Sequence, residues 1–195
     1  MKIRWYLSLF FLLLSFSGSA QDASVPWFVS INIGEQHSGI RKEDYVVSNF
    51  SPLIAIEGGK YFMPGIAFRM GLKGVYYNFI SDSDKHYYGY VYGDLVIDIH
   101  SLIKFRPDRI WNTQVYIGGG AVYNRYPYLN AYVGKLDYPN GRLLSACELG
   151  LTNLFRVSSW LRLGVDVCGI AGWGLYQDSV DMMPSASIKA VYLFK

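Results

Sequence analysis

The chain has 195 residues, which is enough for one domain with a sizeable core. Hydrophobic residues make up 51% of it and charged residues only 17%, and this composition excludes a disordered chain. The formal net charge of +3 comes without a basic cluster, so nothing in the sequence suggests a nucleic-acid partner.

The N-terminal segment predicts a cleaved secretory signal peptide. Two basic residues open it, an apolar run follows over residues 7–16, and small residues precede Gln21. The apolar run is about half as long as the roughly 20 residues that a retained membrane helix needs. We therefore expect residues 1–20 to be removed and residues 21–195 to form one exported domain.

The rest of the chain repeats one pattern, a segment of about 10 to 15 residues with period-two alternation followed by turn residues. The eight predicted strands span residues 26–34, 53–62, 65–78, 87–103, 110–124, 142–154, 160–173 and 185–195. Heptads and a second apolar run of membrane-helix length are absent from the sequence. The pattern predicts an all-β protein.

The connections between these segments alternate in length. The long ones cover residues 34–52, 80–86, 125–141 and 174–183, and the short ones cover residues 62–65, 106–109 and 156–159. This alternation is typical of an up-and-down barrel with loops at one end, and an even number of strands brings both termini to the other end.

The two faces of the strands differ clearly in polarity. In 65–78, apolar Phe68 and Leu72 lie on one face, while Arg69 and Lys73 lie on the other. A soluble, lipocalin-like barrel would turn the apolar face inward, but its solvated outer wall would carry more charge than these sparse polar faces do. We therefore expect the apolar face to contact lipid, in an eight-stranded antiparallel up-and-down transmembrane β-barrel.

Aromatic residues near the strand ends support this orientation, because aromatic girdles mark the two interfaces of a bilayer. One predicted girdle, at the short turns, comprises Trp27, Phe62, Phe105, Trp111, Phe155, Trp160 and Phe194. The other, at the long loops, comprises Tyr76, Tyr77, Tyr87, Tyr88, Tyr123, Tyr126 and Trp173.

The charged face then lines a narrow lumen. By strand parity, eight charges point inward: Arg69, Lys73, Asp94, Asp98, Glu148, Arg162, Asp166 and Lys189. Neighbouring strands should bring Arg69 and Lys73 toward Asp94 and Asp98, and Glu148 toward Arg162. Because buried charges must be paired, we expect a lumen plugged by ion pairs.

The two cysteines, Cys147 and Cys168, lie on consecutive predicted strands, and we assign both to the lipid-facing side. Their positions centre a hairpin near residues 157–158, inside a predicted turn, so the two could lie opposite each other at disulfide distance. A disulfide in an oxidising compartment and two free buried thiols are both open interpretations.

The sequence offers little that suggests catalysis. His100 falls on the interior parity of the fourth strand, and its neighbour Ser101 would point to the opposite face, so the two cannot form a dyad. Gly118–Gly120 lacks the Lys-Ser/Thr and the following helix of a phosphate loop, and would instead permit strand curvature or a close interior contact. We expect no catalytic site, metal or cofactor.

Residues 93–124, GDLVIDIHSLIKFRPDRIWNTQVYIGGGAVYN, resemble the central hairpin of the small OmpA-type outer-membrane barrels. The resemblance implies a porin-like fold in a Gram-negative outer membrane, with periplasmic termini. Full-length members of that family carry a C-terminal peptidoglycan-binding domain. The eighth predicted strand runs to Lys195, the last residue of the sequence, so we expect the barrel domain only.

A structural or surface-interaction role follows from this interpretation. The expected partners are outer-membrane lipid and lipopolysaccharide, the barrel-assembly machinery during insertion, and an unknown extracellular partner at the long loops. Two alternatives stay open, namely a membrane-embedded lipid-modifying enzyme and a soluble lipocalin-like ligand-binding barrel.

Overall fold

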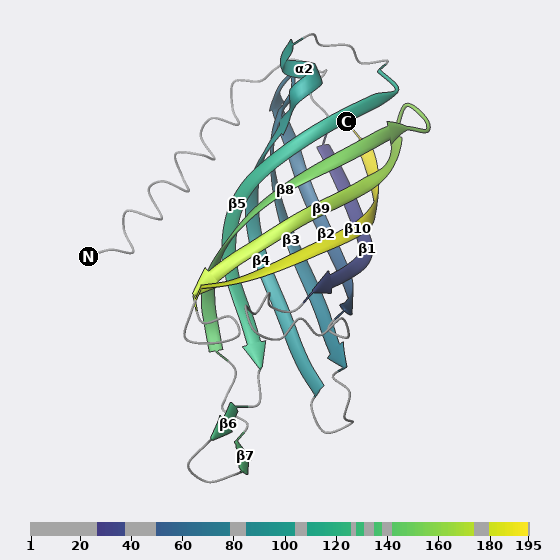
Figure 1. The fold of residues 1–195 in the computed structure, drawn as a ribbon. Coiled ribbons are helices and arrows are strands. Elements are labelled where there is room, and N and C mark those ends of the chain that lie inside the picture. Colours follow the sequence, from purple (N-terminus) through teal and green to yellow (C-terminus); the bar gives the residue numbers. More distant parts are fainter. Residues whose placement is uncertain are drawn as a thin grey trace, which may run out of the picture.

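Eight antiparallel strands close into one barrel in the order β1-β10-β9-β8-β5-β4-β3-β2 (Figure 1). The barrel strands are β1 (Trp27–His37), β2 (Phe50–Met63), β3 (Ile66–Asn78), β4 (Lys85–Asp98), β5 (Trp111–Arg125), β8 (Arg142–Arg156), β9 (Leu161–Trp173) and β10 (Val180–Phe194). The computed structural model describes residues 27–37, 50–78, 85–103, 109–125, 128–130, 135–137, 142–173 and 180–194. The predicted eight-stranded up-and-down β-barrel is confirmed.

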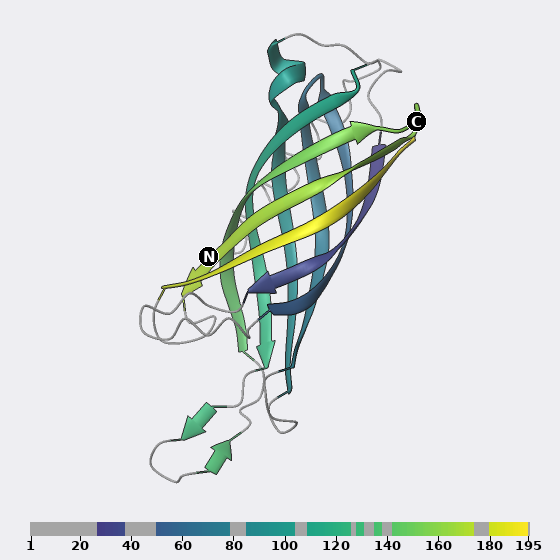
Figure 2. The same cartoon turned by 45° about the vertical axis from the view of Figure 1, so that its right-hand side comes forward.

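The two ends of the barrel differ, as the loop lengths predict. At one end, which we call the short-turn end, β2 and β3 are joined at Pro64-Gly65, and Gly65 has a φ of 84°, a backbone conformation that glycine adopts without strain. Trp27 pairs with Phe194, so the described chain both begins and ends there. The opposite end, the long-loop end, carries a two-stranded sheet that protrudes beyond the barrel strands (Figure 2).

That small sheet consists of β6 (Tyr128–Asn130) and β7 (Lys135–Asp137), inside the connection between β5 and β8. The other segments at the long-loop end are shorter than predicted. β2 begins at Phe50 and β10 at Val180, which leaves residues 38–49 and 174–179 between the strands. The predicted signal peptide, residues 1–20, lies outside the described residues.

The fourth predicted strand ends earlier than the alternation suggests. β4 stops at Asp98, and residues 99–103 form a short helix, α2 (Ile99–Ile103), at the short-turn end. Asp98 caps this helix, because its carboxylate accepts hydrogen bonds from the Ser101 amide at 3.0 Å and the Ser101 hydroxyl at 2.9 Å. In the described part of the chain, no helix is long and apolar enough to cross a membrane.

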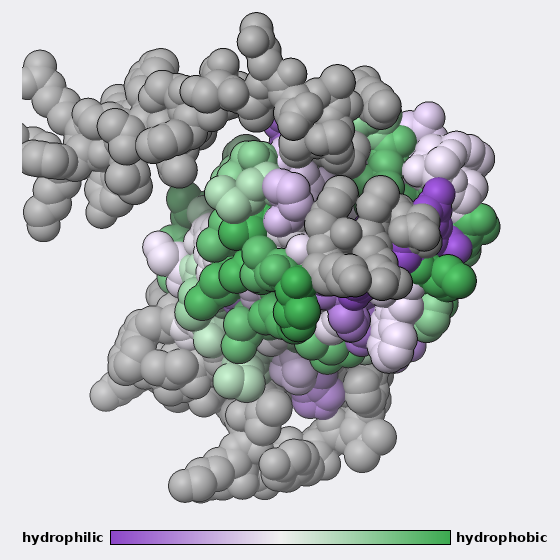
Figure 3. Space-filling view, turned by 90° about the horizontal axis from the view of Figure 1, so that it is seen from above, coloured by the Kyte–Doolittle hydropathy of each residue, from purple (hydrophilic) through white to green (hydrophobic). Residues whose placement is uncertain are grey.

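The barrel turns its apolar side chains outward. Leu72 is 62% exposed and Ile188 is 70% exposed, whereas Arg69 and Asp94 on the same sheet are 2% and 0% exposed. Viewed from the short-turn end, strongly hydrophobic residues occupy much of the visible outer wall (Figure 3). An apolar wall of this extent suits hydrocarbon rather than water, so the chain does not adopt the arrangement of a soluble lipocalin-like barrel.

Aromatic side chains mark the short-turn end of this wall. The exposed members of the predicted girdle are Trp27, Phe62, Trp111, Phe155, Trp160 and Phe194, and Tyr192 joins them. Phe105 lies outside the described residues. Of the girdle predicted at the long-loop end, Tyr123 is exposed, and Tyr76, Tyr77, Tyr87, Tyr88, Tyr126 and Trp173 lie outside the residues whose side chains are described.

Candidate functional site: the charged lumen

A group of charged side chains meets inside the barrel between its two ends; we call it the central cluster. Its members are Glu57 from β2, Arg69 and Lys73 from β3, Asp94 from β4, Glu148 from β8, Asp166 from β9 and Lys189 from β10. Each is at most 5% exposed. They point inward because each lies on the parity opposite to the outward apolar side chains of its strand.

Glu57 is the acceptor with the most partners in the central cluster. Its carboxylate accepts hydrogen bonds from Ser30 Oγ at 2.7 Å and Asn32 Nδ2 at 3.0 Å, both on the neighbouring strand β1. The hydroxyl of Tyr92, on β4, also donates to it at 2.8 Å. Donors from both sides therefore hold this carboxylate toward the centre of the lumen.

Arg69 joins three carboxylates. Its Nε donates to Asp94 Oδ2 at 2.6 Å, its Nη1 lies 3.3 Å from Glu57, and its Nη2 lies 3.8 Å from Glu148. Asp94 is its register partner on the adjacent strand, as the sequence predicts. The guanidinium also lies 3.8 Å from the centroid of the Tyr116 ring, a cation–π contact.

Each of the two lysines reaches a carboxylate on a strand that is not adjacent to its own. Lys73 Nζ lies 3.3 Å from Glu148 Oε2, which links β3 to β8 across the lumen. Lys189 forms a close ion pair with Glu57 and lies 3.9 Å from Asp166. The charges are thus connected around the whole interior rather than in separate adjacent-strand pairs.

Two tyrosine rings fill the space beside these charges. The Tyr92 ring lies over Gly71, where an added Cβ would meet it at 2.5 Å, and the Tyr116 ring lies over Gly150, where an added Cβ would meet it at 2.1 Å. The Tyr116 hydroxyl donates to Asp166 at 2.9 Å. A side chain at either position would have to displace the end of the tyrosine, so the two glycines make room for the rings.

Two members of the predicted set lie outside the central cluster. Asp98 is buried but uses its carboxylate to cap α2 through Ser101. Arg162 is half-buried, and none of the described residues forms an ion pair with it. Among the described residues, Asp98 therefore pairs with neither Arg69 nor Lys73, and Glu148 contacts Lys73 rather than Arg162, so these parts of the predicted network are wrong.

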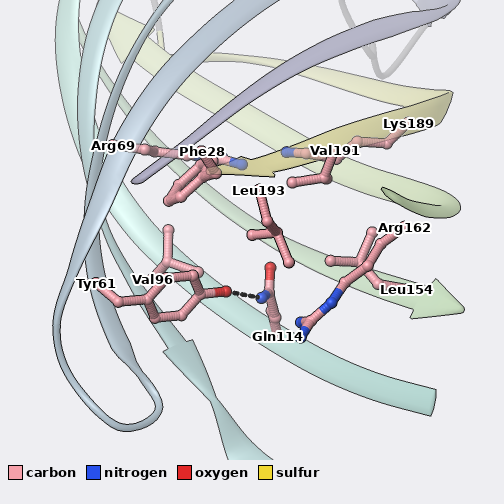
Figure 4. A pocket seen from close by; sticks show the side chains of 10 residues that line it. All are labelled: Phe28, Tyr61, Arg69, Val96, Gln114, Leu154, Arg162, Lys189, Val191 and Leu193. Carbon is pink, nitrogen blue, oxygen red and sulfur yellow. Dashed lines mark hydrogen bonds between the residues drawn. The ribbon is translucent and has the colours of Figure 1, made fainter. Parts of the chain in front are cut away.

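Buried apolar side chains lie on both sides of the central cluster. On the long-loop side, the buried residues are Leu53, Tyr90, Val122, Ile170 and Met183. On the short-turn side, Phe28, Val96, Leu154 and Leu193 surround a cavity of about 10 Å³, into which Arg162 and Gln114 also point (Figure 4). Gln114 Nε2 donates to the Tyr61 hydroxyl there at 2.7 Å. A cavity of this volume has room for about one water molecule.

The two cysteines do not face each other. Cys147 is exposed on the outer wall and pairs in register with Ala171, whereas Cys168 is buried and pairs with Gly150. Cys168 shares the parity of Asp166, so its assignment to the lipid-facing side is wrong. Both thiols are free, because side chains on opposite faces of a sheet cannot form a disulfide.

His100 and Ser101 lie on α2 rather than on a strand, so the prediction that they point to opposite faces of a sheet is wrong. His100 Nδ1 accepts the Thr113 amide at 3.1 Å, while Ser101 Oγ donates to Asp98. The imidazole and the hydroxyl therefore have different partners. Among the described residues, no three His, Cys, Asp or Glu side chains are grouped so that they could hold a metal ion.

Sequence reasoning missed Glu57 and the role of the lumen tyrosines. Glu57 lies on the strand face opposite to Ile54 and Ile56, and this position could have indicated that its side chain points inward. The two glycines that follow Glu57 weaken the alternation of polarity there. Tyr92 shares the polar parity of Asp94, and an inward tyrosine could have been inferred from that.

The fold resembles solved outer-membrane proteins. Ail of Yersinia pestis in complex with the heparin analogue sucrose octasulfate aligns with a TM-score of 0.57 and 12% identity, over 87% of this chain and 99% of that one. Neisserial surface protein A aligns with 0.56 and 9%, over 87% and 97%. The N-terminal barrel of Pseudomonas aeruginosa OprF aligns with 0.52 and 10%, over 86% and 97%. No protein-family model and no curated protein matches the sequence.

These neighbours share the architecture that the chain itself displays, a closed eight-stranded barrel. Their similarity and the outward apolar wall point to the same environment. The chain has the fold of the eight-stranded bacterial outer-membrane barrels, including the OmpA-type barrel domain, and its shape and surface fit that membrane.

Proposed function

We propose that this protein is a plugged barrel that conducts no ions steadily and holds its long loops outside the cell for a surface-interaction role. The filled lumen carries this proposal. The central cluster occupies the interior, apolar side chains cover it toward the long-loop end, and the cavity toward the short-turn end measures about 10 Å³. Transport through such an interior would require breaking buried ion pairs, which is strongly unfavourable.

The chain between the strands at the long-loop end supplies the interaction surface in this proposal. It comprises residues 38–49, 79–84, 126–141 and 174–179, and includes the protruding β6–β7 sheet. In the outer membrane this end faces outward when the termini are periplasmic. The barrel wall contacts lipid and lipopolysaccharide, and we expect the barrel-assembly machinery to insert it.

The composition of these segments indicates what kind of partner they suit. They hold three basic residues, six acidic residues and six tyrosines. Ail was crystallised with a heparin analogue, but a sulfated polyanion needs clustered cations, which these segments lack. Tyrosine supplies large contact area at low cost in conformational entropy, so we expect a tyrosine-mediated contact with another macromolecule.

An enzymatic role has less support. A lipid hydrolase needs a nucleophile, a base and an orienting acid within hydrogen-bonding reach of one another. Ser101 and His100 are sequence neighbours, but the hydroxyl donates to Asp98 and the imidazole accepts a backbone amide. We therefore propose a non-enzymatic barrel.

Planar-bilayer recording tests the plugged lumen. We expect purified protein to give no steady open conductance, while a general porin inserted in the same bilayers gives the expected large steps. A stable, large conductance from the wild-type barrel would overturn the plug and replace it with a water-filled channel.

Chromatography on immobilised heparin tests the partner chemistry separately. We expect the detergent-solubilised barrel to pass through at physiological salt. Retention that is lost at high salt would reveal a polyanion site and contradict the proposed tyrosine-mediated contact.

A further inference from the structure

The central cluster contains more carboxylates than cations. Its carboxylates are Glu57, Asp94, Glu148 and Asp166, and its cations are Arg69, Lys73 and Lys189. Four negative groups therefore face three positive ones, and each of the seven is at most 5% exposed. An uncompensated charge is strongly disfavoured in such surroundings, so one carboxylate should be neutralised.

Two carboxylate oxygens in the cluster lack a hydrogen-bond donor among the described residues. They are Asp94 Oδ1 and Glu148 Oε1. Arg69 Nη2 approaches Glu148 Oε1, but at 3.8 Å it is too distant for a hydrogen bond. The second oxygen of each group is satisfied, since Asp94 Oδ2 accepts from Arg69 and Glu148 Oε2 accepts from Lys73.

The two unsatisfied oxygens belong to side chains in the same cross-strand row. Asp94 pairs with Gly118, and Gly118 pairs with Glu148. A Cβ on Gly118 would lie 2.1 Å from Asp94 Oδ1. Because glycine has no side chain, no atom of residue 118 occupies the space between the two carboxyl groups. Both carboxylates project from this row into the lumen, where Asp94 is 0% and Glu148 2% exposed.

We propose that Asp94 and Glu148 form a buried binding site for one proton, held between Asp94 Oδ1 and Glu148 Oε1. The proton supplies the donor that both oxygens lack and makes the charge of the central cluster neutral. The site lies within the plugged lumen of the proposed function, but it does not depend on what the loops bind.

The surroundings explain why the proton resides on this pair. The charged and titratable groups that face it are Glu57 from β2, Arg69 and Lys73 from β3, Tyr90 and Tyr92 from β4, Tyr116 from β5, Asp166 and Cys168 from β9, and Lys189 from β10. Glu57 accepts from three uncharged donors and pairs with two cations. Asp166 accepts from the hydroxyls of Tyr116 and Thr152. Every carboxylate oxygen of Glu57 and Asp166 therefore already accepts a hydrogen bond, so neither group needs a proton as a donor.

Infrared spectroscopy of the barrel in lipid vesicles tests the site directly. At neutral pH, we expect the wild-type protein to show the carbonyl band of a protonated carboxylic acid. The band should disappear in Glu148→Gln, because the glutamine amide donates permanently to Asp94 Oδ1. It should persist in Glu35→Gln, which alters an exposed carboxylate of β1. A wild-type spectrum without this band would overturn the proposal.

The pH dependence of stability gives a second readout. Above the ordinary carboxyl pKa of about 4.3, the folded barrel keeps a proton that the unfolded chain releases. The unfolding equilibrium constant of the wild type should therefore increase about tenfold per pH unit more than that of Glu148→Gln. Equal slopes would contradict the shared proton.

Two further outcomes separate the possible failures. If a bound monovalent cation neutralises the pair, stability will differ between sodium and choline salts and the acid band will be absent, which overturns the proposal. Conductance recorded on the same preparation shows whether the lumen is plugged. An open lumen would refute the proposed function, whereas a missing acid band in a closed barrel would refute only the proton site.

Discussion

Replacing Glu57 with glutamine should destabilise the barrel strongly. The substitution keeps the shape of the side chain but removes the charge that Arg69 and Lys189 face. The amide nitrogen of the glutamine would also face groups that donate hydrogen bonds to the carboxylate in the wild type, such as Ser30 and Asn32. The one carboxylate left near Lys189 within the central cluster would be that of Asp166, at 3.9 Å. Removing one partner of a buried ion pair typically costs about 3–5 kcal/mol, which is about a hundredfold or more in the unfolding equilibrium constant.

Reversible urea unfolding from lipid vesicles, followed by tryptophan fluorescence, measures this loss. Glu35→Gln on the exposed face of β1 is the matched control, and we expect it to change the free energy of unfolding by less than about 0.5 kcal/mol. If Glu57→Gln loses less than about 1 kcal/mol, the carboxylate is not the acceptor that holds the central cluster together. Heat-dependent mobility on gels then establishes whether the variant still forms a closed barrel.

Four other substitutions or labelling experiments test different parts of the structure. Val165 is 51% exposed on the outward face of β9, so Val165→Arg should lower the free energy of unfolding in bilayers by about 2–4 kcal/mol. A loss below about 0.5 kcal/mol would mean that this face does not contact the hydrocarbon. Gly150→Ala would place a methyl group 2.1 Å from the Tyr116 ring and should lower the free energy of unfolding by about 1–3 kcal/mol. Gly169→Ala on β9 is its control, because a methyl group there meets nothing within 4 Å, and equal losses of stability in the two variants would refute the ring packing. The folded barrel should migrate identically with and without reductant, and a small maleimide should modify Cys147 faster than Cys168; a disulfide detected by mass spectrometry would contradict the assigned faces. Tags at Asp82 and Asn130 should be accessible on whole cells while a tag at Asp108 should not, and the reverse pattern would invert the topology.

The alternation of polarity was sufficient to predict the strands, because a barrel strand with lipid on one side must alternate. It failed at α2 because Ile99 and Ile103 continue the odd parity of β4 beyond its true end at Asp98. The strand ends where the Asp98 carboxylate accepts a hydrogen bond from the Ser101 amide and caps α2. An aspartate followed by a serine three residues later is compatible with a strand as well, so period alone cannot distinguish the two.

Parity predicted the direction of the lumen charges, but it could not predict their partners. Arg69 and Asp94 are register neighbours, and that pair follows from adjacency. Lys73 reaches Glu148 across the lumen, and this contact depends on the tilt of the strands and on which side chains leave room. Glycines set much of that room, as at Gly118 and Gly150, and a sequence does not reveal which ring or carboxylate each glycine admits.

The lumen charges also specify how the strands pair. Shifting one strand by a single residue turns every side chain to the opposite face. For β3, such a slip would move Arg69 and Lys73 out of the central cluster and into the lipid-facing wall, at a cost of about 2–4 kcal/mol for each charge near the bilayer midplane. It would simultaneously leave Asp94 and Glu148 without their cations, and Glu57 with Lys189 alone. An apolar interior would impose no comparable penalty, because lipid accepts an outward leucine as readily as the lumen accepts an inward one. The central cluster therefore makes the native register far more favourable than its nearest alternatives, and it does so whether or not the cluster adds net stability over an apolar filling.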